Sequence, residues 1–277
     1  MHRALNSHTG PAGNLLAHSC LLIGLLWLTA CTSVTNKLDA RAPLDGAVVT
    51  SLPGGQFSLY AVERTGVGRH ARVFIEGDGR PWLAGGRAIS DNPTPRKTPL
   101  LDWMMQTPGP ALYLGRPCYF EQDSPACHPM LWTYSRYSET VLDSMQAALN
   151  HWLAHQPDIN ELTLIGHSGG GVLALLLAER IPQTSSVVAI ATPLDIDRWA
   201  DLHGYGRLFD SINPAQQTEW RSGVTRLLLF GKKDSQVPAD AFSATAKTIP
   251  GAEVHVIEEA GHECCVIYRN SGLLVDP

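Results

Sequence analysis

Ser168 lies in an arrangement of glycines that favours a nucleophilic serine. Gly166 and Gly170 stand two residues to either side of it, in a Gly-x-Ser-x-Gly pattern. Apolar residues 162–165 precede the pattern and a helix-forming segment follows it. We therefore predict a nucleophile elbow, a strained turn that exposes the serine Oγ to a base. The bare pattern is common by chance, so the prediction depends on this strand-turn-helix context.

A serine nucleophile needs two partners, and two later strand ends supply them. A base must take the serine proton, and a carboxylate must hold the imidazole in the right tautomer. Asp234 follows the apolar run 227–230, and His262 follows the run 254–257. Their order after Ser168, acid and then base, is the order of an α/β-hydrolase.

Other residues compete for the acid and base roles. Asp195 and Asp197 follow the expected strand that ends near Ala191, and they are the alternatives for the acid. His255 is a weaker candidate for the base because it lies inside an expected strand. For His262 the alternative is an ordinary histidine in a surface loop.

Taken together, these motifs resemble the α/β-hydrolase fold family over about residues 56–268. The resemblance implies a mostly parallel sheet with helices on both faces and a small cap region. It also implies that Ser168, Asp234 and His262 form a catalytic triad. We therefore expect the α/β class, with the α/β-hydrolase fold.

The same resemblance implies an oxyanion hole, which needs two N–H donors. The backbone of Gly169, next to the nucleophile, is expected to supply one. The second is expected from the loop after the run 72–75, where relatives commonly carry His-Gly and this chain has Glu76 and Gly77. Our candidate there is the backbone of Asp78, followed by Gly77, and the alternative is an ordinary glycine turn.

Short apolar runs alternate with helix-periodic segments along most of the chain, which predicts a parallel sheet with its chemistry at the carboxyl ends of the strands. The segment that starts at Tyr137 is expected to be a helix that only packs on the core, since its apolar residues recur at helical steps. The expected strands are 57–62, 72–75, 111–114, 162–165, 187–191, 227–230 and 254–257. The expected helices are 99–106, 137–155, 170–180 and 239–247.

A few further residues are candidates for the substrate pocket. Trp82, Trp132 and Tyr134 could line an acyl pocket, and core packing is the alternative. Arg96, in a proline-rich loop, could meet a substrate carboxylate or simply lie on the surface. The segment around 199–214 has room for a small cap, which favours small or medium substrates.

Composition bounds the class of protein. The chain has 277 residues, of which 44% are hydrophobic and 17% charged, and this predicts one globular domain over residues 51–277. The net charge of -5 and the lack of a basic cluster argue against a nucleic-acid partner. We expect a small-molecule ester or acyl substrate, with no cofactor and no metal.

Residues 1–30 resemble a bacterial lipoprotein signal peptide. Arg3 precedes the leucine-rich run 15–30, which ends in small residues before Cys31. The resemblance implies cleavage before Cys31, lipidation of that thiol, and a tether over residues 31–50. It also implies a lipid-anchored protein of the bacterial cell envelope, at the outer membrane. An ordinary secretory signal is the alternative, and a transmembrane anchor is disfavoured because the run is short.

Four further cysteines would lie in an oxidising compartment. Cys118 and Cys127 bracket a short polar segment, which predicts a disulfide. The adjacent Cys264 and Cys265 could pair with each other, or one could stay free. Zinc is disfavoured because the pairs lack the CxxC spacing and a histidine pair.

The sequence thus leads to one preferred function and two alternatives. We expect a membrane-tethered serine hydrolase that acts on carboxylic esters. A peptidase or thioesterase would use the same triad. A non-catalytic binding module on the same fold is the alternative from another class.

Overall fold

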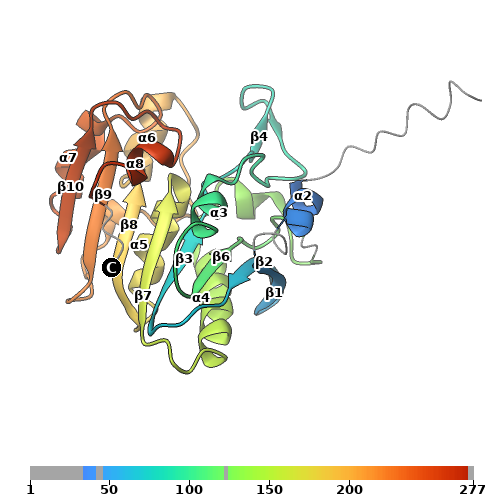
Figure 1. Ribbon diagram of the computed structural model, residues 1–277. Helices are drawn as coiled ribbons and strands as arrows, with labels where there is room; N and C mark the ends of the chain where they lie inside the picture. Colours follow the sequence, from blue (N-terminus) through green and yellow to red (C-terminus); the bar gives the residue numbers. More distant parts are fainter. Residues whose placement is uncertain (1–33, 42–45, 122–123, 274–277) are drawn as a thin grey trace, which may run out of the picture. The chain divides into compact units, whose positions relative to one another are not determined.

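The computed structural model describes residues 34–41, 46–121 and 124–273. The chain from Val34 onward forms one compact unit (Figure 1). The predicted signal peptide and Cys31 lie outside the described residues. Within the described part of the chain, no helix has the length and apolar character needed to cross a membrane.

One mixed sheet organises this unit (Figure 1). Its strands are β1 (Val48–Gly54), β2 (Phe57–Arg64), β3 (His70–Ile75), β6 (Ala111–Leu114), β7 (Glu161–His167), β8 (Thr184–Ile190), β9 (Thr225–Gly231) and β10 (Ala252–Ile257). They are ordered β1-β2-β6-β3-β7-β8-β9-β10, and only the β1–β2 and β2–β6 pairs of this sheet are antiparallel. A separate hairpin joins β4 (Trp82–Leu83) to β5 (Ala88–Ile89). The predicted mostly parallel sheet is confirmed.

Helices cover both faces of the sheet. The bounds are α3 (Pro99–Met104), α4 (Glu139–Ala154), α5 (Gly169–Ala178), α6 (Ile196–His203), α7 (Ala239–Ala246) and α8 (Val266–Arg269). The β3–α3–β6 crossover runs toward β1, and the β6–α4–β7 crossover runs back past β3. Right-handed crossovers that run in opposite directions place their helices on opposite faces, so α3 covers one face and α4 the other (Figure 1).

The helix after the elbow is buried along its whole length. Every residue of α5, from Gly169 to Ala178, is buried. A helix that is apolar on all sides must be covered on all sides, and α5 packs against β7, β8 and α4. The N-terminus of α5 is therefore held firmly at the carboxyl edge of the sheet.

The expected strands and helices are all present, with ends shifted by a few residues, but some elements were missed. The expected tether contains the helix α2 (Val34–Arg41) and the start of β1. Leu38 of α2 is buried, and Asp39 accepts a hydrogen bond of 3.0 Å from Tyr60. A two-turn helix is too short to give a periodic pattern, and tertiary contacts stabilise it instead.

Candidate active site

Ser168 stands in the sharp turn between β7 and α5. Its backbone has φ 52° and ψ −122°, a left-handed φ that is unfavourable for a residue with a Cβ. The Ser168 N–H donates to the Ile190 carbonyl at 2.8 Å and so ties the turn to β8. A Cβ at Gly166 would collide with the backbone of Gly170. The turn therefore has the strand-turn-helix geometry of a nucleophile elbow.

Asp234 and His262 are hydrogen-bonded to each other. The Nδ1 of His262 donates to Oδ2 of Asp234 at 2.9 Å. The other carboxylate oxygen accepts from the N–H groups of Gln236 at 2.7 Å and Val237 at 2.8 Å. Burial opposes ionisation, but these hydrogen bonds outweigh it and lower the pKa of Asp234. An ionised carboxylate in this position can hold the imidazole in one tautomer.

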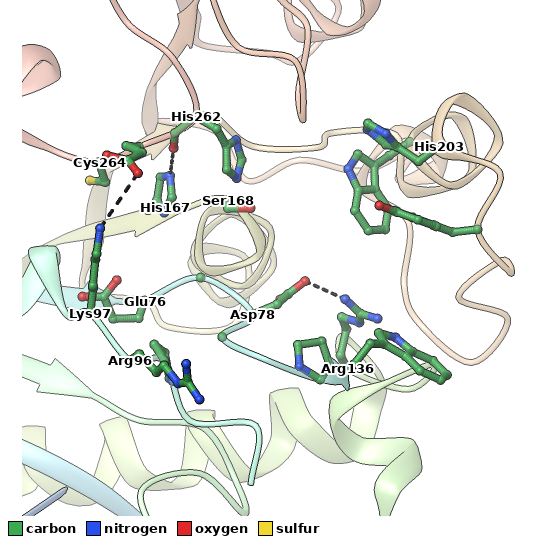
Figure 2. A pocket seen from close by; sticks show the side chains of 18 of the residues that line it. Glu76, Asp78, Arg96, Lys97, Arg136, His167, Ser168, His203, His262 and Cys264 are labelled. Carbon is green, nitrogen blue, oxygen red and sulfur yellow. Dashed lines mark hydrogen bonds and ion pairs between the residues drawn. The ribbon is translucent and has the colours of Figure 1, made fainter. Parts of the chain in front are cut away.

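The candidate nucleophile and the candidate base line the same cavity. Ser168 and His262 both line a pocket of about 1260 Å³. Figure 2 shows the His262 ring on the same wall of this pocket as Ser168. The His262 side chain is 28% exposed, whereas its partner Asp234 is fully buried. The imidazole can therefore be reached from the pocket while its acid is shielded from water.

His167, the residue before Ser168, links the elbow to the His262 loop. Its Nε2 lies 2.7 Å from the carbonyl oxygen of His262, and because a carbonyl only accepts, Nε2 must donate. The two rings lie 5.1 Å apart between centroids. Burial, together with the neighbouring imidazole of His262, lowers the pKa of His167 to about 4. His167 is therefore neutral near pH 7 and tethers the loop that carries the candidate base.

The residues expected to supply the two oxyanion donors lie against each other. A Cβ built on Gly169 would collide with Oδ1 of Asp78, and a Cβ on Gly77 would lie 3.5 Å from the Cβ of Ser168. Within the described residues, the N–H groups of Gly169 and Asp78 donate to no protein acceptor. The Gly77 N–H lies near the carboxyl of Glu76 and lowers its pKa. This arrangement favours Asp78 over Gly77 as the second donor.

The side chain of Asp78 belongs to a buried ionic cluster that sequence analysis missed. Its Oδ1 accepts from Arg116 at 2.7 Å, and its Oδ2 accepts from Arg136 at 2.8 Å and from the hydroxyl of Tyr137 at 2.7 Å. Burial alone would raise the pKa of Asp78, but the guanidinium groups of Arg136 and Arg116 hold it well below its usual value. Asp78 is therefore ionised.

Tyr137 makes a contact that was not predicted from the sequence. The helix predicted to start there begins at Glu139, and its apolar face packs on the core as predicted. The hydroxyl of Tyr137, however, reaches the Asp78 carboxylate. No local pattern could have revealed this contact, since the two residues are 59 positions apart.

Glu76 occupies the place where the family resemblance led us to expect a histidine. Its Oε1 accepts from the Leu100 N–H at 2.8 Å, at the start of α3. Burial raises the pKa of Glu76 to about 8, although the N–H groups of Leu100 and Leu101 oppose this rise. A carboxyl with this pKa is mostly protonated at neutral pH.

Aromatic and cationic side chains form the remaining walls of the pocket. Trp82 and Tyr134 line it, in edge contact at 5.6 Å between ring centroids. Trp132 is instead buried and donates to the Ser90 carbonyl at 3.0 Å, so its packing alternative is the correct one. Other lining residues are Trp199, His203 and Tyr205 around α6, with Arg96 and Lys97 on another side (Figure 2).

The alternatives for the acid and the base make other contacts. Asp195 and Asp197 both accept hydrogen bonds from the side chain of Asn213, at 3.0 Å and 3.3 Å. His255 pairs with Glu253 at 2.7 Å. The described residues hold no group of three or more His, Cys, Asp or Glu side chains that could bind a metal ion.

The described residues include two pairs of bonded cysteines. Cys118 and Cys127 form a disulfide, with Cα atoms 5.7 Å apart, in the loop after β6. The adjacent Cys264 and Cys265 also pair with each other. Cys264 lines the pocket two residues after His262.

Comparison with known proteins places this geometry in a family. The model of the dienelactone hydrolase family matches residues 109–270, which is more than half of the chain. No curated protein sequence matches the chain.

Solved structures share the fold at low sequence identity. An esterase from Pyrococcus furiosus has a TM-score of 0.56 at 12% identity, over 78% of this chain and 82% of its own. A proline iminopeptidase-related protein from Thermus thermophilus has a TM-score of 0.55 at 15% identity, over 78% and 90%. The 2-hydroxy-6-oxo-6-phenylhexa-2,4-dienoate hydrolase from a Rhodococcus species has a TM-score of 0.53 at 18% identity, over 78% and 92%.

Proposed function

The chain belongs to the dienelactone hydrolase family of the α/β-hydrolase superfamily, and from this premise we propose that it is a serine hydrolase of carboxylic esters. Ser168 is the nucleophile, His262 the general base and Asp234 its orienting acid. The observation that carries the proposal is the 2.9 Å hydrogen bond between His262 and Asp234, beside the strained turn of Ser168 in one pocket. Loss of a triad member is what a non-catalytic module would show, and none is missing.

The proposed reaction proceeds in two halves. The Oγ of Ser168 attacks the ester carbonyl carbon while Nε2 of His262 takes the serine proton, and Asp234 stabilises the resulting imidazolium. The backbone N–H groups of Gly169 and Asp78 receive the negative charge on the carbonyl oxygen. His262 then gives the proton to the departing alkoxide. Water, deprotonated by His262, attacks the acyl-enzyme, and the carboxylic acid leaves as Ser168 regains its proton.

The lining of the pocket and its short cap support the proposal that the substrates are small or medium esters. The pocket is lined by the aromatic rings of Trp82 and Tyr134 and by those of the cap residues Trp199 and Tyr205. The cap consists mainly of one short helix, α6. Rings of this kind favour contact with an apolar acyl or alcohol group.

The direct test compares native protein with Ser168→Ala on a short p-nitrophenyl ester. We expect turnover to fall by about 10⁴-fold or more, together with loss of labelling by a fluorophosphonate probe. Ser58→Ala, an exposed serine on β2, is the matched control and should keep both. Unchanged turnover in Ser168→Ala contradicts the proposal. Faster turnover of a matched thioester or anilide would assign the same triad to a thioesterase or a peptidase.

We also propose that the protein is anchored to the bacterial cell envelope by a lipid on Cys31. The support is the run 15–30 and the small residues before Cys31. Cells that express the full chain should incorporate radiolabelled palmitate into the protein and retain it in the outer-membrane fraction. Cys31→Ser should abolish the label, and label that persists in this variant contradicts the anchor.

A further inference from the structure

The loop between β3 and α3 contains an aspartate between two glycines. Side chains from other segments of the chain hold this loop in place. Gly77 and Gly79 flank Asp78, and Gly79 has φ +68°. A loop of this composition has many accessible backbone conformations. The direction of the Asp78 N–H is therefore not determined by the loop alone.

Buried side chains from distant segments fix the peptide groups on both sides of that N–H. Arg116 donates to the Glu76 carbonyl at 3.0 Å, and Tyr119 donates to the Asp78 carbonyl at 3.0 Å. The N–H of Asp78 lies between these two anchored carbonyls. Anchoring the chain on both sides of this peptide group restricts the backbone conformations that are open to it.

The Asp78 carboxylate adds three more contacts. Arg116, Arg136 and Tyr137 each donate to it, at 2.7 to 2.8 Å. Both arginine side chains are only 4% exposed. Charge-assisted hydrogen bonds of this kind are shorter and stronger than neutral ones. Both oxygens of the carboxylate are therefore fixed by hydrogen bonds.

The same cluster touches the other oxyanion donor. A Cβ placed on Gly169 would collide with Oδ1 of Asp78 and with the hydroxyl of Tyr137. The carboxylate and the phenol therefore lie directly against the residue that supplies the first N–H. One buried cluster contacts both donors of the proposed oxyanion hole.

The charge of the cluster also suits an oxyanion. The guanidinium groups of Arg116 and Arg136 face one carboxylate, that of Asp78, which leaves an excess positive charge. Arg136 also lines the pocket beside Ser168. Positive charge in a site shielded from water stabilises negative charge that develops nearby.

We propose that Arg116, Arg136 and Tyr137 are positioning residues that act through the Asp78 carboxylate to hold the two oxyanion donors in place. This inference rests on the proposed function, because an oxyanion hole has a role only if Ser168 attacks a carbonyl. It assigns a role to three side chains that do not touch the reacting atoms.

The test uses Tyr137→Phe in the full chain, with a p-nitrophenyl ester as substrate. The variant keeps the ring and loses one hydrogen bond to Asp78. We expect kcat to fall about 10-fold with KM nearly unchanged, because the oxyanion exists only after the attack begins. Affinity for an alkyl boronic acid, whose adduct with serine carries the tetrahedral negative charge, should fall in parallel.

Tyr60→Phe is the matched control. It removes a tyrosine-to-aspartate hydrogen bond of 3.0 Å, which joins β2 to Asp39 of α2. We expect kcat and boronate affinity to stay at the native values. Thermal unfolding of both variants shows whether the loss of one buried hydrogen bond has similar structural cost in each.

Arg136→Lys separates geometry from charge, since lysine keeps the positive charge but loses the planar fork. A fall in kcat in this variant supports the positioning role. Native kcat in both Tyr137→Phe and Arg136→Lys overturns the inference, and so does a rise in KM at native kcat. If these variants behave natively while Ser168→Ala is inactive, the proposed function stands without the inference. If Ser168→Ala stays active, the proposed function itself fails.

Discussion

On one side of the pocket, a short backbone turn holds the Asp234 carboxylate in place, whereas on the other side the Asp78 loop depends on buried side chains from distant segments. The Asp234 carboxylate accepts from N–H groups two and three residues further along the chain. Asp78 accepts from side chains 38, 58 and 59 residues away. The Asp234 carboxylate is thus positioned locally, whereas the position of the Asp78 carboxylate requires the completed fold.

Two neighbouring carboxyl groups show what such partners decide. Glu76 and Asp78 are two residues apart; Glu76 is buried, and the side chain of Asp78 is 17% exposed. Burial raises the pKa of Glu76 to about 8, because the backbone N–H groups around this carboxyl oppose the rise without cancelling it. For Asp78 the guanidinium groups of Arg136 and Arg116 reverse the effect of burial. Ionisation here depends on the partners and not on depth alone.

The largest expected effect comes from a substitution on the Asp234 side of the pocket. Asp234→Asn should lower kcat by about 10⁴-fold, because an amide no longer holds the imidazole tautomer or stabilises the imidazolium. Its oxygen can still accept from the N–H groups of Gln236 and Val237, so the urea unfolding midpoint should change little. Steady-state kinetics and urea unfolding check both parts. A loss below 10-fold would mean that another group, such as Asp195 or Asp197, serves His262.

Asp78→Asn should damage the second side in a different way, through stability as well as activity. It leaves two buried guanidinium groups without a carboxylate, and we expect a loss of about 3 kcal/mol in the free energy of unfolding. Because the pKa of Asp78 is held below its usual value, this contribution is present above about pH 4 in the native protein and is lost as the pH falls further. Urea unfolding at pH 7 and pH 3 should show a difference between variant and native protein that shrinks at pH 3. An equal difference at both pH values contradicts the assignment.

A smaller effect is expected at His167, whose hydrogen bond joins the Ser168 turn to the His262 loop. His167→Phe removes the hydrogen bond to the His262 carbonyl, and kcat should fall about 10-fold. His167→Gln can still donate to that carbonyl and should restore most of the loss. The pKa of His167 is about 4, so its own protonation should leave no step in kcat between pH 6 and pH 9. Equal kcat in both variants argues against the tether.

The last expected effect concerns the pH dependence of stability at Glu76. A carboxyl with a pKa raised to about 8 binds its proton more tightly in the folded state, so native stability should decline as the pH rises from about 4.3 to 8. Glu76→Gln is neutral, can still accept from Leu100, and should remove this part of the decline. Thermal unfolding across this range measures it. An unchanged slope in the variant means that Glu76 does not titrate there.

Much of the fold could be predicted because its signals are local. The apolar run before Gly166, the serine, and the glycine-led helix that follows lie within one short segment, and its strand, turn and helix appear as predicted. The order of Ser168, Asp234 and His262 is likewise a property of the chain. The short helix α2 was not predicted, and the sequence left open whether Trp132 lines the pocket or packs in the core, because tertiary contacts decide both.

By itself the sequence determined the α/β-hydrolase fold and the candidate nucleophile, acid and base, since strand-turn-helix patterns and chain order are encoded in neighbouring residues. The lipid anchor at Cys31 stays a prediction. Only the tertiary structure decided that Arg116, Arg136 and Tyr137 converge on Asp78. An arginine has the same local pattern whether it is solvated or buried, and packing alone brings such distant charges together where water cannot screen them.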